Sequence, residues 1–248
     1  MSTSSATLQA ENTILQWRAN PVQFATDALG VTPEPWQAEA LTSLATEDRV
    51  SIRSGHGVGK SALDSWTILW WLSTRYPAKC AVAAPTQHQI KDVLWAELAT
   101  WHRRMPVALN QQFDISSSAQ NMRFSLRAAP EESFAVGRSG QKDNPEALQG
   151  FHSPNMMFLL DEASGIDDIV FEVASGALST KGAKILMTAN PTRTSGYFHR
   201  SHHSNRDQWH TMRVSCLESS QVSEDYPKQM ARDYGLESNV YRVRVLGE

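Results

Sequence analysis

The chain has few of the features that mark secreted or membrane proteins. Its 248 residues include only two cysteines, Cys80 and Cys216, which do not indicate a disulfide framework and favour a reducing compartment. No apolar run approaches the ~18 residues of a membrane span, so no membrane partner is expected. The first residues, MSTSSATLQAEN, lack the basic and apolar regions of a signal peptide and are expected to form a loose polar tail.

The chain also lacks an excess of basic residues. Its formal net charge is −3, which does not indicate a nucleic-acid-binding protein by itself. The charge is uneven, because residues 101–142 hold six basic and three acidic side chains, a local net charge of +3. A solvated surface is the commoner meaning of such a segment, and a surface that contacts phosphates is the alternative. The basic residues are Arg103, Arg104, Arg123, Arg127, Arg138 and Lys142.

Apolar runs alternate with helical patterns along the chain. The runs KCAVAAP, NMMFLLDEA and AKILMTANP are apolar on both faces, as in buried parallel strands. Residues 61–76 and 87–105 have the spacing of apolar and amphipathic helices. This alternation predicts an α/β fold with a mainly parallel central sheet flanked by helices. Residues 112–129 read as a hairpin, and the polar, glycine-bearing stretch 131–151 is expected to be a mobile loop.

The stretch RSGHGVGKS, residues 53–61, lies between a short strand and a long helix. A phosphate-binding P loop has the spacing G-x-x-x-x-G-K-[ST] in this context, and glycines let its backbone approach the phosphates. Gly59, Lys60 and Ser61 fit the end of the motif, whereas Ser54 occupies the first glycine position. The alternative is an ordinary glycine-rich turn with a chance lysine. The predicted nucleotide contacts are Ser54, Gly55, His56, Gly57, Val58, Gly59, Lys60 and Ser61.

Two acids follow the apolar run that ends at residue 160. In P-loop nucleotide hydrolases an aspartate at this place holds Mg²⁺, and we predict that Asp161 does so together with Ser61. Glu162, directly after it, is well placed to activate the attacking water as a general base. Plain surface acids are the alternative.

Two smaller features fit the same site. Gln37, about one helix before the P loop, is predicted to contact the adenine of ATP, with a surface glutamine as the alternative. Trp36 fits core packing better than stacking on the base. The strand at 183–191 ends in Thr188, Ala189, Asn190 and Pro191, whose polar groups are predicted to contact the γ-phosphate or its water; a capped turn is the alternative.

The order of these motifs resembles the ATPase domain of the large terminase subunits of tailed bacteriophages and prophages. PEPWQ is followed by RSGHGVGKS, APTQHQIKDVLW, QGFH with MMFLLDEASG, TANPTRTSG and YRVRVLGE, over roughly residues 30 to 248. The resemblance implies a P-loop NTPase of the additional-strand, RecA-like type, with ATP and Mg²⁺ as cofactors. It also implies a coupling role for residues 188–191 and an adenine role for Gln37.

The resemblance further implies partners and a setting. They are double-stranded DNA, a homo-oligomeric ring, the portal of the procapsid and the small terminase subunit, in the cytoplasm of a bacterial host. Residues 1–30 are expected to be a tail and helical extension, and residues 31–248 the motor domain. Large terminases also carry a C-terminal nuclease. The acids after Pro191 are too few to build one, so no nuclease activity is expected from this chain.

Phosphoryl transfer also needs positive charge near the γ-phosphate. Arg53 is a candidate sensor within its own subunit, and Arg138, set among small and polar residues, is the candidate for a trans-acting arginine; Arg127 is second choice. The histidines of the stretch 197–210 have spacings that suit a metal, but a polar helix end fits them better because no cysteine or carboxylate joins them at a typical interval. These histidines are His199, His202, His203 and His210.

The main functional hypothesis is therefore ATP-driven translocation of double-stranded DNA. A helicase-like or remodelling ATPase is the second, although such enzymes need a second RecA-like lobe. A non-catalytic scaffold that uses ATP only for assembly is the third, and the intact set of Lys60, Ser61, Asp161 and Glu162 argues against it.

Overall fold

The structure is a computed structural model of the whole chain, and it describes residues 2–118, 121–140, 152–177 and 180–248. Eight strands form one sheet in the order β3-β4-β5-β2-β6-β7-β1-β8. The strands are β1 (Arg49–Ser54), β2 (Ala78–Ala84), β3 (Phe113–Ser118), β4 (Asn121–Leu126), β5 (Phe134–Ser139), β6 (Asn155–Asp161), β7 (Lys184–Ala189) and β8 (His210–Val214).

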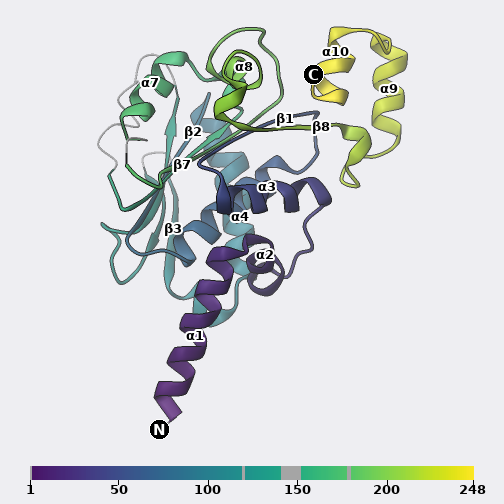
Figure 1. Cartoon of the computed structure of the whole chain (residues 1–248). Coiled ribbons are helices and arrows are strands. Elements are labelled where there is room, and N and C mark those ends of the chain that lie inside the picture. The colour runs from purple at the N-terminus through teal and green to yellow at the C-terminus, as the bar shows by residue number, and fades with distance from the viewer. Residues whose placement is uncertain (1, 119–120, 141–151, 178–179) are drawn as a thin grey trace.

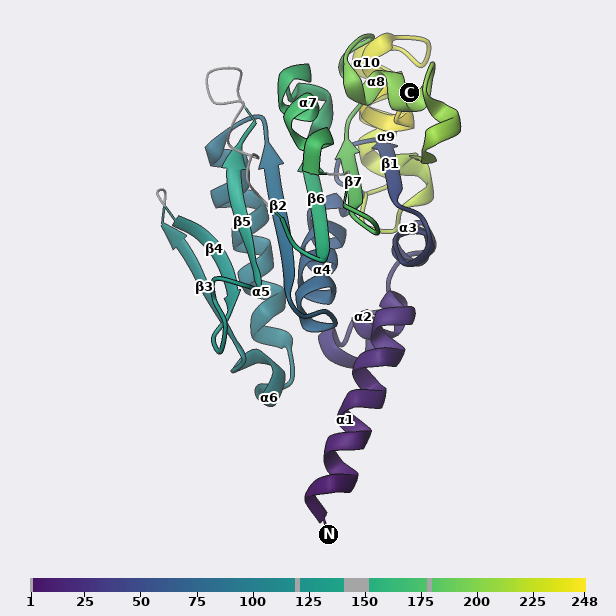
Figure 2. The same cartoon turned by 60° about the vertical axis from the view of Figure 1, so that its left-hand side comes forward.

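In the sheet order, all pairs from β5 to β8 are parallel, and β4 pairs antiparallel with both β3 and β5 at one edge. The α/β fold and the hairpin are therefore confirmed. The strand β7 lies between β1, which leads into the P loop, and β6, which ends in Asp161. This inserted strand is the mark of the additional-strand type, and it brings the ends of β1, β7 and β6 side by side (Figure 2).

Helices cover both faces of the sheet (Figures 1 and 2). One face packs on α4 (Lys60–Ser73), the π-helix η1 (Gln89–Trp95) and α5 (Ala96–Arg104). The other packs on α7 (Asp168–Ala177) and α8 (Tyr197–His202). Alternate residues of the central strands enter the two cores, because successive side chains of a strand point to opposite faces. This alternation decides which residues of β1 face the P-loop helix and which face α8.

The remaining helices lie at the two ends of the chain and in its connections. They are α1 (Ser2–Ala19), α2 (Pro21–Leu29), α3 (Pro35–Thr46), α6 (Val107–Asn110), α9 (Asp225–Tyr234), α10 (Asn239–Tyr241), the π-helix η6 (Arg242–Leu246) and the 3₁₀ turns η3 (Ala163–Gly165), η4 (Arg206–Gln208) and η5 (Cys216–Glu218). In the part of the chain that the structure describes, no helix is long and apolar enough to cross a bilayer.

Two expectations about local structure were wrong. Residues 2–19 form one helix, α1, rather than a loose tail, and it projects from the body of the domain (Figures 1 and 2). The segment contains no glycine or proline, and its alanine, leucine, glutamine and glutamate residues favour a helix. Phe134–Ser139 is strand β5 rather than part of a loop, because it pairs with β2 along its whole length. The rest of the expected loop, residues 141–151, lies outside the described residues.

The π-helix η6 packs against the end of β1, and α10 and α9 follow it outward at the C-terminal end of the chain (Figure 1). The amide of Gly55 donates to the Val214 carbonyl at 2.9 Å, and the amide of His56 donates to the Arg244 carbonyl at 2.8 Å. The phosphate loop is thus held from behind by the strand and the helix that come last in the chain.

Candidate active site

The P loop runs from the end of β1 into α4, as predicted. Gly59 caps α4 with φ of 97°, a conformation that glycine adopts without strain. A Cβ atom on Gly59 would also lie 2.9 Å from Nε2 of Gln37. A glycine is therefore required at this position both by the backbone angle and by the neighbouring side chain.

The serine that replaces the first glycine of the motif supports the lysine. Lys60, which is 8% exposed, donates from Nζ to Oγ of Ser54 at 3.2 Å. The carbonyl of Ser54 accepts a hydrogen bond of 2.6 Å from Nδ2 of Asn190. The variant motif is thus built into a hydrogen-bonded end of β1 and does not disturb the lysine.

The two acids lie where β6 ends. Asp161 is the last residue of β6 and is buried, and burial, reinforced by the neighbouring Glu162 carboxylate, raises its pKa to about 6. Glu162 has φ of 48° and is the only residue other than glycine with positive φ among those described. This strained conformation is typical of functional sites. It directs the Glu162 carboxylate to Lys60, with 3.6 Å between Oε1 and Nζ.

Asn190 joins the three strand ends. Its side chain donates to the Ser54 carbonyl and accepts from Lys60 at 3.4 Å, and its backbone amide donates to Oε2 of Glu162 at 3.3 Å. The residues predicted from three separate motifs are therefore brought together at one edge of the sheet, around the lysine amine.

Thr188 connects this cluster to a residue that the sequence reasoning missed. Its hydroxyl donates to Oδ2 of Asp64 at 2.9 Å and lies 3.5 Å from Oδ1 of Asp161. Asp64 is fully buried in α4, and burial, followed by repulsion from Asp161, raises its pKa well above the usual value. The signal was present, since an acid four residues after the P-loop lysine in an apolar helix lies on the same face as that lysine.

The side chains of the site include more acidic than basic groups, an arrangement that favours a divalent cation. Three carboxylates, those of Asp64, Asp161 and Glu162, surround one amine, and Oδ1 of Asp64 is buried without a hydrogen-bond partner. Oxygen ligands of this kind suit Mg²⁺. Ser61, in the first turn of α4, and Asp161 are the residues that we expect to hold the ion.

Gln37 is buried, and both ends of its amide are hydrogen-bonded. Its Oε1 accepts from the Glu34 amide at 3.0 Å, and its Nε2 donates to the Gly59 carbonyl at 3.1 Å. An adenine contact through this side chain would use its second N–H or the second lone pair of Oε1, which these two bonds leave free. Trp36 is 7% exposed and belongs to the core, which is the preferred interpretation of the sequence.

Glu34 extends this connection to the C-terminal part of the domain. Its carboxylate accepts hydrogen bonds from the hydroxyls of Ser219 and Ser220, at 2.7 and 2.6 Å, and from the amide of Ser220 at 2.7 Å. The pKa of Glu34 is lowered, because these bonds and one from Trp36 outweigh its partial burial. A chain of hydrogen bonds thus leads from residues 219–220 to the last glycine of the P loop.

The other P-loop residues differ in how closely they pack against the rest of the domain. Val58 is fully buried and belongs to the core, so its side chain is closed to a ligand. The His56 amide is bonded to Arg244, and burial, together with Lys60, lowers the pKa of its imidazole. A Cβ atom on Gly55 would lie 2.5 Å from Sγ of Cys216, whereas one on Gly57 would lie 3.8 Å from Val222.

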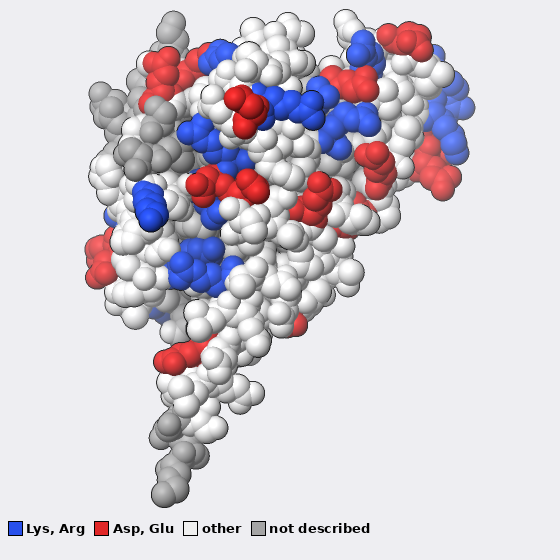
Figure 3. Space-filling view, in the orientation of Figure 1, with Lys and Arg blue, Asp and Glu red and all other residues white. Residues whose placement is uncertain are grey.

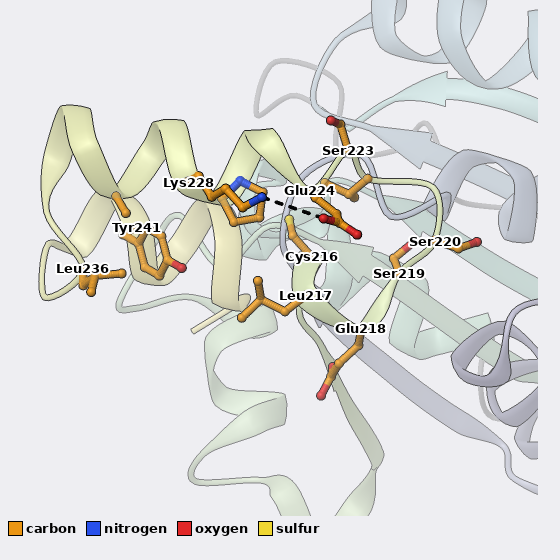
Figure 4. Close-up of a pocket in the computed structure, with 13 residues that line it drawn as sticks. Cys216, Leu217, Glu218, Ser219, Ser220, Ser223, Glu224, Lys228, Leu236 and Tyr241 are labelled. Carbon is orange, nitrogen blue, oxygen red and sulfur yellow. Dashed lines mark ion pairs between the residues drawn. The ribbon is translucent and has the colours of Figure 1, made fainter.

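A cavity of about 730 Å³ adjoins this side of the P loop (Figure 4). It lies between η5 and α9, and Leu236 and Tyr241 form one end whereas Ser219 and Ser220 lie at the other. An ion pair of 3.7 Å between Lys228 and Glu224 lies along its wall. Cys216 and Val222 of its lining lie next to Gly55 and Gly57, so the cavity borders the P loop on the side of the C-terminal helices.

The two candidate arginines lie apart from Lys60. Arg53 lines another cavity, with Pro191, His199 and His203, because its side chain points to the α8 side of the sheet. Arg138 is half-buried near the end of β5, where its guanidinium donates to the Gly137 carbonyl at 3.2 Å. Arg138 therefore lies at the carboxyl ends of the parallel strands, where the site is also located, but on a strand rather than on a loop.

The basic segment of residues 101–142 does not form one free basic surface. Arg127 pairs with Asp114 at 2.8 Å, Arg104 lies over Trp101, and Arg123 lies over Phe134. Lys142 lies outside the described residues.

The histidines follow the polar interpretation. His199 and His203 stack with ring centroids 4.0 Å apart, and His202 bonds to Ser51 at 2.9 Å. Within the described parts of the chain, no group of three or more histidine, cysteine or acidic residues has the geometry of a metal site.

The fold and the site together define an additional-strand P-loop NTPase domain. Comparison with known proteins narrows this class. No family model matches the chain. A probable terminase large subunit of Enterobacteria phage P7 is 30% identical over 239 residues, covering 90% of this chain and 47% of that protein. The chain thus spans about half the length of this curated relative.

Solved structures agree with the sequence match. The large terminase ATPase domain of Thermus phage P74-26 has a TM-score of 0.71 at 16% identity, covering 92% of this chain and 98% of the other. The large terminase of a second thermophilic bacteriophage, in complex with ADP, has a TM-score of 0.65 at 13% identity, covering 86% and 51%. The resemblance to the ATPase domain of phage large terminase subunits is therefore confirmed, in sequence by the relative and in fold by these structures.

Proposed function

We propose that this chain is a Mg²⁺-dependent ATPase domain that drives translocation of double-stranded viral DNA into procapsids. The observation that carries the proposal is the convergence of Lys60, Glu162 and Asn190 at the ends of β1, β6 and β7. The relation to a terminase large subunit adds the DNA-packaging role, and the ADP complex of the second thermophilic phage terminase supports a nucleotide as the ligand.

Four side chains of the site have distinct roles in the proposed reaction. The amine of Lys60 exchanges its bonds to Ser54 and Asn190 for the β- and γ-phosphates of ATP and neutralises their charge. Ser61 and Asp161 hold Mg²⁺, which stabilises the charge of the leaving phosphate groups when bound. Glu162, released from Lys60, accepts a proton from the attacking water.

The γ-phosphate also has candidate reporters. Asn190 contacts both Lys60 and Glu162, and Thr188 contacts Asp64 on the P-loop helix. Loss of the γ-phosphate would change the partners of these side chains, and through β7 the change would reach the rest of the domain. We propose that this is how hydrolysis is coupled to movement.

The assembly belongs to the same proposal. By analogy with packaging motors, the chain would act as a ring of subunits at the portal of the procapsid, with the small terminase subunit, in the cytoplasm of the host. A non-catalytic scaffold has no use for a strained Glu162 paired with Lys60.

The decisive experiment is a steady-state phosphate-release assay on the purified chain. We expect ATP turnover that stops when Mg²⁺ is chelated and that is lost in Lys60→Ala. ATP binding without any turnover, in the presence of Mg²⁺ and at high protein concentration, would favour the scaffold instead.

A further inference from the structure

A second cavity, of about 610 Å³, lies on the α8 side of the sheet. It is enclosed by the segment after β7, by α8 and by the C-terminal π-helix η6. Its lining includes three guanidinium groups, two imidazoles and one carboxylate. These residues are Arg53, Arg193, Arg242, His199, His203 and Glu248. Figure 3 shows blue atoms, with some red ones among them, gathered where the α8 region adjoins the C-terminal helices.

The single carboxylate of this cavity is already engaged. Glu248 pairs with Arg242 at 3.1 Å and with Arg213, just outside the lining, at 3.3 Å. Arg53 and Arg193 have no acidic partner within ion-pair distance among the residues that the structure describes. Glu248 also attracts Arg53 from beyond ion-pair distance, but this one carboxylate is shared with Arg242 and Arg213, so positive charge remains in excess in the cavity.

Of these two arginines, Arg53 has the less favourable environment for its positive charge. It is half-buried on β1, and burial, together with the nearby charge of Arg213, lowers the pKa of its guanidinium. An arginine nevertheless stays charged in a protein, and its five N–H donors need acceptors. A half-buried cation among other cations is unfavourable unless an anion joins it. The cavity thus has the composition of a site whose ligand is negatively charged.

We propose that this cavity binds a phosphate group, held mainly by the forked donors of Arg53 and Arg193. Planar guanidinium groups match phosphate oxygens in pairs, and Thr192, Thr194 and Asn239 add neutral donors around the same space. The phosphate would belong either to a nucleic-acid backbone or to a free phosphate ion. The first source rests on the proposed function, whereas the second does not.

The test uses the Lys60→Ala chain, so that the P loop does not contribute phosphate affinity. Inorganic phosphate is titrated by calorimetry, and a duplex of random sequence by fluorescence anisotropy. Arg53→Gln and Arg193→Gln are each expected to weaken binding about tenfold, which corresponds to about 1.4 kcal/mol, because each removes charge-assisted hydrogen bonds to the phosphate. Arg232→Gln, an exposed arginine on α9, is the matched control and should leave binding unchanged.

The two arms separate the sources. Loss of duplex affinity in both variants, with phosphate competing against the duplex, assigns the cavity to a nucleic-acid backbone. Loss of phosphate affinity alone assigns it to the free ion. Arg193 is exposed, so its variant is expected to fold even where Arg53→Gln does not.

The proposal is overturned if neither ligand binds saturably, or if Arg53→Gln, Arg193→Gln and Arg232→Gln bind equally. Its failure would not bear on the P loop, because ATP turnover is measured separately in the chain with Lys60 intact. A chain that lacks ATPase activity but binds phosphate through Arg193 would in turn refute only the proposed function.

Discussion

Lys60 and Glu162 form an ion pair across the mouth of the P loop, with 3.6 Å between Nζ and Oε1. In this arrangement the residue proposed to bind phosphate and the proposed general base neutralise each other. Nucleotide binding must open the pair, because the amine turns to the phosphates. The carboxylate is then free to accept a proton from water only when the nucleotide is present. Without nucleotide, the ion pair keeps the carboxylate from acting as a base.

Glu162→Gln separates binding from turnover. We expect ATP affinity to be kept or slightly increased, because the lysine loses a competing partner, while turnover falls by roughly 10²–10⁴ through loss of a general base. Calorimetry and phosphate release measure the two effects. Lys60→Ala is the matched contrast, since it should lose ATP binding itself. Parental turnover in Glu162→Gln would remove Glu162 from the proposed role.

Gln37→Ala tests what the buried amide does. The substitution removes one of the two hydrogen bonds to the Gly59 carbonyl, which keeps that of the Leu63 amide at 3.3 Å, and leaves the Glu34 amide without its partner; an unsatisfied buried group costs about 1–3 kcal/mol. We therefore expect ATP and GTP to bind about tenfold more weakly, to the same extent, in calorimetric titrations. Gln229→Ala, in exposed α9, is the control. A loss confined to ATP would instead show that the amide also reads adenine.

Arg138 remains the predicted trans-acting arginine. If a neighbouring subunit supplies it, specific ATPase activity rises with protein concentration. Arg138→Ala, inactive alone, should regain turnover when mixed with Glu162→Gln, because an intact site then meets an intact arginine. Arg127→Ala is the comparison, since Arg127 is held by Asp114 at 2.8 Å. Mixtures that stay inactive at every ratio, or an active Arg138→Ala chain, would exclude Arg138.

His202 should make the domain sensitive to acid. Burial, with the nearby Arg53 as the next cause, lowers its pKa from 6.5 to about 3. The folded state therefore keeps the imidazole neutral, whereas the unfolded state takes up a proton as pH falls below about 6.5. The free energy of unfolding should decrease by about 1.4 kcal/mol per pH unit between about pH 6 and pH 4 from this residue alone.

Urea unfolding at a series of pH values checks this effect. In His202→Asn the free energy of unfolding should depend less steeply on pH, by the slope that corresponds to about one proton, because asparagine does not take up a proton. Asparagine can still bond to Ser51, so the fold should be kept. Equal slopes for the two chains would show that His202 is protonated in the folded state.

The sequence predicted the parts of this structure that depend on local pattern. Strand, glycine loop and helix around Lys60, and the acids at the end of β6, follow from spacing and hydrophobicity. It could not predict that Asp64 meets Thr188, because that contact joins α4 to a strand more than a hundred residues later. Nor could it show that Gln37 is engaged by Gly59, since a motif gives residue type but not hydrogen-bond partners.

The two misjudged segments have different physical origins. Phe134–Ser139 contains glycine and polar residues, which favour a loop locally, but pairing with β2 on one side and β4 on the other overrides that preference. In contrast, α1 forms from residues whose polarity resembles a tail but whose local propensity favours a helix. Only its end is fixed by a distant residue, where Trp70 donates to the Trp17 carbonyl at 2.7 Å.

The position of β1 in the sheet has a consequence for biosynthesis. The strand is made early, at residues 49–54, yet its two partners, β7 and β8, begin at residues 184 and 210. While the chain is still on the ribosome, β1 therefore has two unpaired edges and an uncovered apolar surface, the state most open to chaperones and to aggregation. The His56 amide donates to the carbonyl of Arg244, which is translated later still. A nascent chain is thus unable to assemble its nucleotide site until almost all of the domain has been translated.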